Sequence, residues 1–182
     1  MHGVRVLLPV TVVALVVAAI VAVFSARPDI QQAKRRVDAS WGTLSPQLDQ
    51  RYALLQKADT ATLAIPGPVH QVAADVQTGL TRWQAVRTHG SVRDQVAAAN
   101  ALEGLGRRLL ATAVASPRAA QNAPAKAALE AYVANQAVAT AADFNATVAS
   151  YARERQGPVR TVVANMLGDG DIPALDTTGT PA

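Results

Sequence analysis

Apolar residues recur at helical spacing along most of the chain, and this periodicity constrains the fold more than any other feature of the sequence. The clearest stripe has spacings of 4, 3, 4, 4 and 3 residues, which place its side chains on one face of a helix. Its members are Val37, Trp41, Leu44, Leu48, Tyr52 and Leu55. No segment of the sequence alternates apolar and polar residues as a half-buried strand does. The sequence therefore predicts an all-α fold.

Prolines and glycines divide this pattern into separate helices. The first stripe keeps its register across Pro46, which favours one kinked helix over a new helix with this proline in its first turn. The run Ile-Pro-Gly-Pro at 65–68 ends the helix, because each proline disfavours a helical conformation in the residue before it. A second stripe over 69–86 predicts a helix that stops before Gly90.

A third helix is predicted from Ser91 to just before Pro117. Ser91 and Asp94 resemble a capping box, in which the serine oxygen accepts a hydrogen bond from a backbone N–H three residues later. Gly104 and Gly106 lie inside this helix, where they either weaken it or permit another helix to approach closely.

The remainder of the body is rich in alanine, a strong helix former. Residues 126–155 contain no helix breaker and are predicted to form the longest uninterrupted helix of the body. A Gly-Pro pair ends it, and a short helix over 159–167 follows. We therefore expect 27–167 to form an antiparallel four-helix bundle. Residues 168–182, rich in Gly, Asp, Thr and Pro, are predicted to be a disordered tail.

An uncharged apolar run at the N-terminus, residues 7–24, is 18 residues long. A run of about 18 or more such residues is typical of a transmembrane helix, here preceded by a short flank, residues 1–6. The alternative is a cleaved signal peptide, whose apolar core is usually about 7 to 15 residues long. Cleavage after Ala26 would also place the bulky Phe24 where a small residue is preferred. The sequence thus predicts a single-pass anchor in a lipid bilayer.

Basic residues near the anchor predict its orientation. Only Arg5 precedes the segment, whereas Arg27 and the run 34–36 follow it. Because lysine and arginine are enriched on the cytoplasmic side, the bundle is expected in the cytoplasm with the N-terminus outside. The net charge of +4 is densest in this run beside the membrane, which favours lipid headgroups over nucleic acid as its partner.

Several stretches, in order along the chain, carry a resemblance to the LemA family of bacterial membrane proteins. The stretches are VDASW at 37–41, LDQRYAL at 48–54, NAL at 100–102, LL at 109–110, SPRAAQN at 116–122 and FNATVASY at 144–151. The resemblance covers about residues 30 to 168 and implies an N-terminal membrane helix followed by an antiparallel helical domain. It implies no activity, because the family has none agreed.

This chain departs from the family pattern at several positions, so it resembles a divergent member. Gln50 stands where the family has Arg, Ser116 where it has Tyr, and Gly157 where it has Phe. The chain is also rich in alanine and arginine and poor in lysine, a composition typical of bacteria with GC-rich genomes.

No catalytic, cofactor-binding or metal site is predicted from the sequence. The chain has no cysteine, and His2, His70 and His89 lack the spacing of a zinc site. It contains neither a nucleophile-elbow motif nor a glycine-rich phosphate loop, so we expect no enzyme; a Ser, His and acid brought together by folding would reopen a hydrolase interpretation.

Some side chains admit two interpretations. Trp41, Tyr52 and Trp83 lie on apolar stripes, where core packing is favoured over a ligand groove. Arg51 and the pair 107–108 are expected on solvated faces. A second group, Asn100 and Asn145, lies within apolar stripes, where a polar side chain needs a hydrogen-bond partner and can set helix register.

Two functions fit these features. The first is a membrane-anchored, non-enzymatic interaction or scaffold module of the bacterial cell envelope that binds an envelope protein through the bundle or the tail. It predicts exposed apolar patches and no buried ionisable cluster. The alternative is a small-ligand sensor or carrier, which predicts a cavity between the helices lined by Trp41 and Trp83.

Overall fold

The computed structural model describes residues 4–135, 137–166 and 170–176 of the 182-residue chain, with side chains described from Ser25 onward except at 26 and 137–140. All regular elements in these ranges are α-helices, so the predicted all-α fold is confirmed. Within the residues whose side chains are described, no helix is long and apolar enough to cross a bilayer. The predicted membrane segment, residues 7–24, lies outside them.

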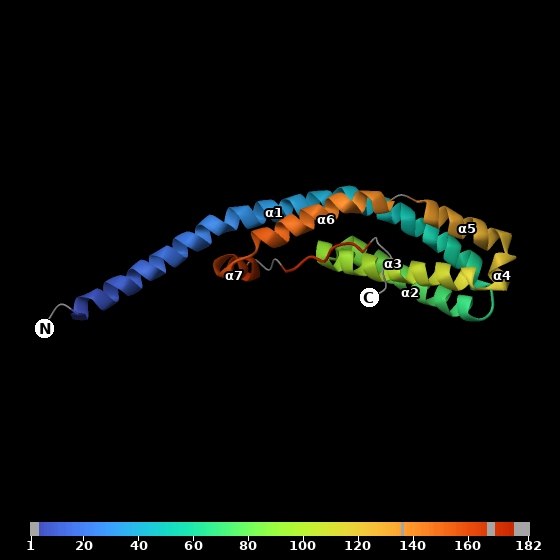
Figure 1. Cartoon of the computed structure of the whole chain (residues 1–182), viewed down its shortest axis with the longest axis horizontal. Coiled ribbons are helices and arrows are strands. Elements are labelled where there is room, and N and C mark those ends of the chain that lie inside the picture. Colours follow the sequence, from blue (N-terminus) through green and yellow to red (C-terminus); the bar gives the residue numbers. More distant parts are fainter. Residues whose placement is uncertain (1–3, 136, 167–169, 177–182) are drawn as a thin grey trace.

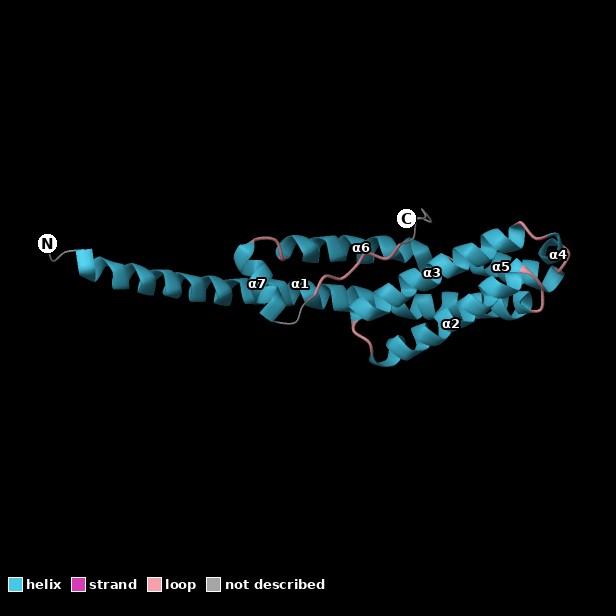
Figure 2. Cartoon of the chain, turned by 90° about the horizontal axis from the view of Figure 1, so that it is seen from below, coloured by secondary structure: helices cyan, strands magenta, loops and turns pink. Residues whose placement is uncertain are grey.

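Helix α1 (Val4–Leu63) is a single helix of 60 residues. At 1.5 Å per residue it is about 90 Å long. Its N-terminal part extends beyond every other helix, and the rod bends gently along its length (Figure 1, Figure 2). The helix continues through Pro28 and Pro46, which confirms the prediction of one helix across Pro46. It ends at the predicted turn, where Gly67 has a φ of 104°, a conformation that favours glycine.

Helices α2 (Pro68–His89) and α3 (Val92–Val114) form a hairpin close to the predicted bounds. Ser91 caps α3 as expected: its Oγ accepts from the Asp94 N–H at 3.2 Å and donates to Asp94 Oδ2 at 2.6 Å. The close approach that a glycine permits occurs at Gly106, where an added Cβ would overlap the Tyr132 hydroxyl.

The predicted single helix over 126–155 is wrong. After the short α4 (Pro117–Ala120), the chain forms α5 (Ala123–Ala134) and a separate α6 (Ala137–Glu154). In a continuous helix the Tyr132 and Asn135 carbonyls would accept from N–H groups four residues later. Arg51 Nη1 donates to both carbonyls instead, at 3.1 and 3.2 Å. A buried side chain from α1 thus binds carbonyls at the point where local helix propensity favours a continuous helix.

The predicted disorder of 168–182 is wrong for 170–176, and the other residues of that range lie outside the described part. After α7 (Pro158–Met166), residues 170–176, here named the tail segment, run in an extended conformation against α3 and α6. Composition favoured disorder, but Leu175 finds a place in the core and is only 3% exposed. Burial of one leucine offsets part of the entropy lost by ordering the chain.

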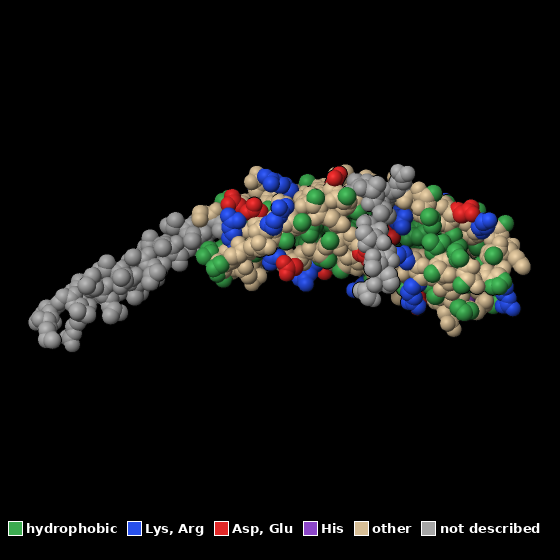
Figure 3. Space-filling view, in the orientation of Figure 1, with side chains coloured by type: hydrophobic (Ala, Val, Ile, Leu, Met, Phe, Trp, Pro, Cys, Tyr) green, Lys and Arg blue, Asp and Glu red, His purple; other side chains and the backbone are tan. Residues whose placement is uncertain are grey.

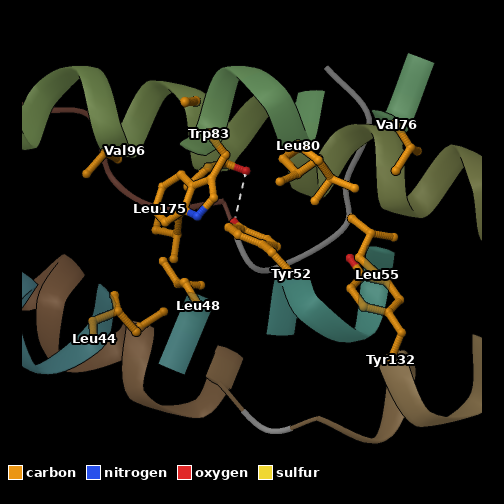
Figure 4. Close-up of a cluster of buried hydrophobic side chains, with 14 of the residues drawn as sticks. Leu44, Leu48, Tyr52, Leu55, Val76, Leu80, Trp83, Val96, Tyr132 and Leu175 are labelled. Atoms are coloured by element: carbon orange, nitrogen blue, oxygen red, sulfur yellow. Dashed lines mark hydrogen bonds between the residues drawn. The ribbon is translucent and has the colours of Figure 1, made fainter. Parts of the chain in front are cut away.

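Helix α1 forms the centre of the arrangement. It packs against α2, α5, α6 and α7, while α3 packs mainly against α2. The predicted stripe of α1 lies fully in the core, together with its counterparts from the other helices (Figure 4). The tail segment crosses from the α7 end along the space between α6 and α3 (Figure 1).

Candidate functional site

Two asparagines from different helices hold the tail segment from both sides. Asn145 on α6 accepts from the Leu175 N–H at 2.7 Å and donates to the Leu175 carbonyl at 2.9 Å. Asn100 on α3 accepts from the Asp176 N–H at 2.7 Å and donates to the Ala174 carbonyl at 2.9 Å. We name this pair the asparagine clamp. Both asparagines therefore have the hydrogen-bond partners that the sequence predicted. These partners are backbone groups of the tail segment and not side chains of another helix.

The geometry of the clamp is that of a β-strand between two neighbours. In an extended chain, the backbone groups of one residue point to one side and those of the residues before and after it point to the other. Asn145 pairs with Leu175 itself, and Asn100 pairs with its two neighbours. An asparagine amide carries a donor and an acceptor side by side, which matches the C=O and N–H that an extended chain presents together on one side. The hydrogen bonds of the clamp therefore involve only backbone atoms of the tail segment.

The clamp also contains one apolar anchor. Leu175 belongs to the same cluster of buried side chains as Leu48, Trp83 and Val96 (Figure 4). Ala174, the residue before this anchor, is exposed. Ile172 is partly buried against the same core. The backbone contacts thus fix the register that directs the leucine inward.

Arginines pair with the acidic residues of the tail segment. Arg107 donates to Asp176 at 2.9 Å, and Arg155 pairs with Asp171. The Tyr151 hydroxyl lies 3.5 Å from the Gly170 carbonyl. Because these ion pairs are partly exposed, each adds about 0 to 1 kcal/mol. They favour a segment with carboxylates beside its apolar anchor.

A buried ion pair connects α1 to α3. Arg51 binds Glu103 through two hydrogen bonds of 2.8 and 3.0 Å, and Tyr132 donates to the same carboxylate at 3.2 Å. The Arg51 guanidinium also stacks 4.2 Å from the centre of the Tyr132 ring. The expectation of a solvated Arg51 is therefore wrong, since this residue is 8% exposed. The expectation that no ionisable cluster is buried is wrong for the same reason.

Charge and burial fix the protonation of this network. Burial by itself lowers the pKa of Arg51, but the hydrogen bond and charge of Glu103 outweigh it, so its pKa lies above the ordinary value. Burial, and then the charge of Glu103, raise the pKa values of Tyr52 and Tyr132. Both phenols stay protonated at neutral pH, and Tyr52 donates to the Ala99 carbonyl at 3.3 Å. The network has a structural role, because it joins α1, α3 and α5.

The tryptophans pack against other aromatic rings instead of lining a ligand groove. Trp41 and Trp83 are each 3% exposed. Their ring centroids are 6.4 Å apart, and those of Trp41 and Phe144 are 5.1 Å apart. The indole nitrogens donate to Gln95 at 2.8 Å and to Asp49 at 3.1 Å. Core packing is thus confirmed, and the alternative function loses its predicted lining residues.

A second feature is an exposed apolar groove of about 480 Å³ at the far end of the molecule, between α3, α4 and α5. Val114 and Val133 line it and are 78% and 55% exposed. Figure 3 shows hydrophobic side chains gathered around this end. The prediction of exposed apolar patches is confirmed here. No group of His, Asp and Glu residues suited to a metal ion occurs within the described part of the chain.

No family model, curated protein sequence or solved structure matches the chain. The LemA resemblance therefore stays a prediction from the sequence. The clamp was missed because its bound segment has a disorder-like composition. The available signals were the two asparagines within apolar stripes and the apolar pair Ile172 and Leu175 in a polar tail.

Proposed function

We propose that this protein is a non-enzymatic, membrane-anchored interaction module whose asparagine clamp binds an extended peptide segment of a partner protein. The observation that carries the proposal is the four-bond recognition of a backbone by Asn100 and Asn145. Side chains that satisfy an extended backbone on both edges resemble the strand-addition mode of peptide recognition. The tail segment occupies the clamp as an internal ligand. A partner segment is expected to share its chemistry, which is an apolar residue with a carboxylate beside it.

The energetics support exchange of this ligand. Burial of a leucine side chain stabilises by about 1.5 to 3 kcal/mol. Ordering each residue of a flexible segment costs about 1 to 2 kcal/mol in backbone entropy. The tail segment has only one fully buried anchor, so its docking is marginal and a partner segment of similar chemistry can displace it. Tethering favours the tail segment over a free competitor, because a short linker gives the tail an effective concentration on the order of millimolar.

The membrane location is part of the same proposal. Residues 7–24 span the bacterial cell membrane once, and the body lies on the cytoplasmic side with the N-terminus outside. The support is the uncharged apolar run and the absence of any break in α1 between this segment and the core. The body, made of α1, α2, α3 and the α5–α6 pair, is proposed to form a LemA-like antiparallel four-helix bundle that holds the clamp at a fixed position relative to the membrane.

A peptide-binding measurement tests the function. The full chain in lipid nanodiscs carries Leu175→Asp, which places a charge in an apolar site and releases the tail. A fluorescent peptide with the sequence of residues 168–178 is then titrated and its anisotropy recorded. We expect saturable binding that is at least tenfold tighter than to the wild-type chain, because the tethered competitor is removed.

Two matched variants control this measurement. Ala174→Asp adds the same charge one residue earlier, where the side chain is exposed, and is expected to behave as the wild type. Leu175→Asp combined with Asn100→Ala and Asn145→Ala is expected to lose the peptide. Equal binding to this triple variant, or no saturable binding to Leu175→Asp, contradicts the proposed function.

A further inference from the structure

Helix α7 exposes three large apolar side chains on one of its faces. Val159, Val162 and Met166 are 38%, 54% and 77% exposed. At 100° per residue these positions fall within about 60° of one another around the helix. Val163 and Ala164, in contrast, are buried and hold α7 against the rest of the protein. Single exposed apolar residues are common on protein surfaces, whereas a cluster on one helix face suggests a contact.

The contact between α7 and α1 places this face near the predicted membrane segment. Arg160 pairs with Asp29 on α1 at 3.6 Å, and it also binds Glu154 at 2.7 Å. Asp29 follows the predicted membrane segment, residues 7–24, by five positions, which is about 7.5 Å along a helix. The polar headgroup layer on each side of a bilayer is about 5 to 8 Å thick. Helix α7 therefore lies at the depth of the headgroups when residues 7–24 span the membrane.

The surface around α7 has the matching composition. Hydrophobic side chains gather at the end of the body from which the N-terminal part of α1 leaves (Figure 3). Exposed arginines lie on the adjoining parts of α1 and α6, at Arg27, Arg35, Arg36 and Arg153. An apolar helix face flanked by basic residues is the pattern of helices that lie in a membrane interface and contact anionic lipids.

We infer that α7 is an interfacial helix that inserts Val159, Val162 and Met166 among the headgroups and upper acyl chains of an anionic bilayer. This inference rests on the membrane anchor of the proposed function and is independent of the asparagine clamp. A second contact beside the anchor restricts the tilt and rotation of the body, so that the clamp faces a fixed direction. A partner protein on the same face is the alternative that the experiment decides.

Lipid-dependent quenching at a single site tests the inference. The chain has no cysteine, so one introduced cysteine is the only labelling site. Val162→Cys carries an environment-sensitive fluorophore in the full chain, reconstituted into phosphatidylcholine vesicles with one-quarter phosphatidylglycerol. Thr161→Cys, exposed on a different face of α7, is the matched control. Lipids with a quencher near the headgroup are expected to quench the label at position 162 severalfold more strongly than the label at 161.

The outcomes separate this inference from the anchor. Equal quenching at 161 and 162 in protein that floats with the vesicles overturns the interfacial helix and leaves the anchor standing. Failure of the full chain to float with the vesicles overturns both. Peptide binding by the clamp is measured separately and depends on neither result.

Discussion

Arg51 joins three helices through one guanidinium. It is on α1, it binds Glu103 on α3, and it donates to two carbonyl oxygens at the C-terminal end of α5. Four donor contacts compensate for the cost of removing this charge from water. The break between α5 and α6 is thus maintained by a residue more than eighty positions earlier in the chain.

Replacing Arg51 with methionine tests this role. Removing one partner of a buried ion pair leaves the other charge uncompensated, which costs about 3 to 5 kcal/mol. We expect Arg51→Met to lower the free energy of unfolding by that amount in denaturant titrations. Arg108→Met is the control, because Arg108 is 64% exposed and 3.8 Å from Asp75. A loss of no more than 1 kcal/mol for Arg51→Met would show that the pair contributes little.

Asp59 gives stability a dependence on pH. Its side chain is buried, Oδ1 has no hydrogen-bond partner, and burial raises its pKa to about 6. The pKa of Asp59 in the folded state lies above the unfolded value of 3.8. Its contribution to the free energy of unfolding is therefore fully present below pH 4 and is lost as the pH rises through 6.

Comparison of Asp59→Asn with the wild type isolates this effect. The difference between pKa values of about 6 and 3.8 corresponds to about 3 kcal/mol. We expect the variant to be more stable than the wild type by up to that amount at pH 8, and equal to it at pH 4. Chemical denaturation at several pH values measures the difference. A stability difference that stays constant from pH 4 to 8 would contradict the assignment.

At the scale of elements, α3 contains a matched pair of glycines. An added Cβ at Gly104 has no neighbour within 4 Å, whereas at Gly106 it would overlap the Tyr132 hydroxyl that binds Glu103. Alanine in a helix is favoured over glycine by about 1 kcal/mol. We expect Gly104→Ala to stabilise the protein and Gly106→Ala to destabilise it, because displacing a packed ring costs about 1 to 3 kcal/mol. Thermal unfolding of the two variants measures these effects. A shift of the unfolding temperature in the same direction for both variants would refute the close packing at Gly106.

Local signals account for the elements that the sequence predicted correctly. The ends of α1, α2 and α3 depend on prolines, Gly67 and the Ser91 cap, all of which act within a few residues. The break at Asn135 and the docking of Leu175 depend on contacts between distant segments, which no local pattern carries. The sequence shows that the two asparagines of the clamp need hydrogen-bond partners, but no local pattern indicates which segment supplies them.

At the scale of the whole molecule, four features follow one another along the direction of α1. The predicted membrane segment occupies the N-terminal end of α1, and α7 lies beside α1 where this end leaves the body (Figure 1). The tail segment and the clamp follow along the body, and the apolar groove between α3, α4 and α5 lies at the far end. In the membrane-anchored arrangement that we propose, this order places the clamp away from the lipid surface, where a peptide segment can reach it.

A distance measurement in the full chain shows whether the clamp holds an extended segment that a competing peptide displaces. Spin labels at Ala131→Cys and Ala174→Cys report the separation of α5 and the tail segment by pulsed electron paramagnetic resonance, since both side chains are exposed and the chain has no cysteine. We predict one narrow distance distribution that broadens with excess peptide of residues 168–178 and with Leu175→Asp. A narrow distribution that survives both changes, or a broad one in the labelled chain alone, would contradict the account.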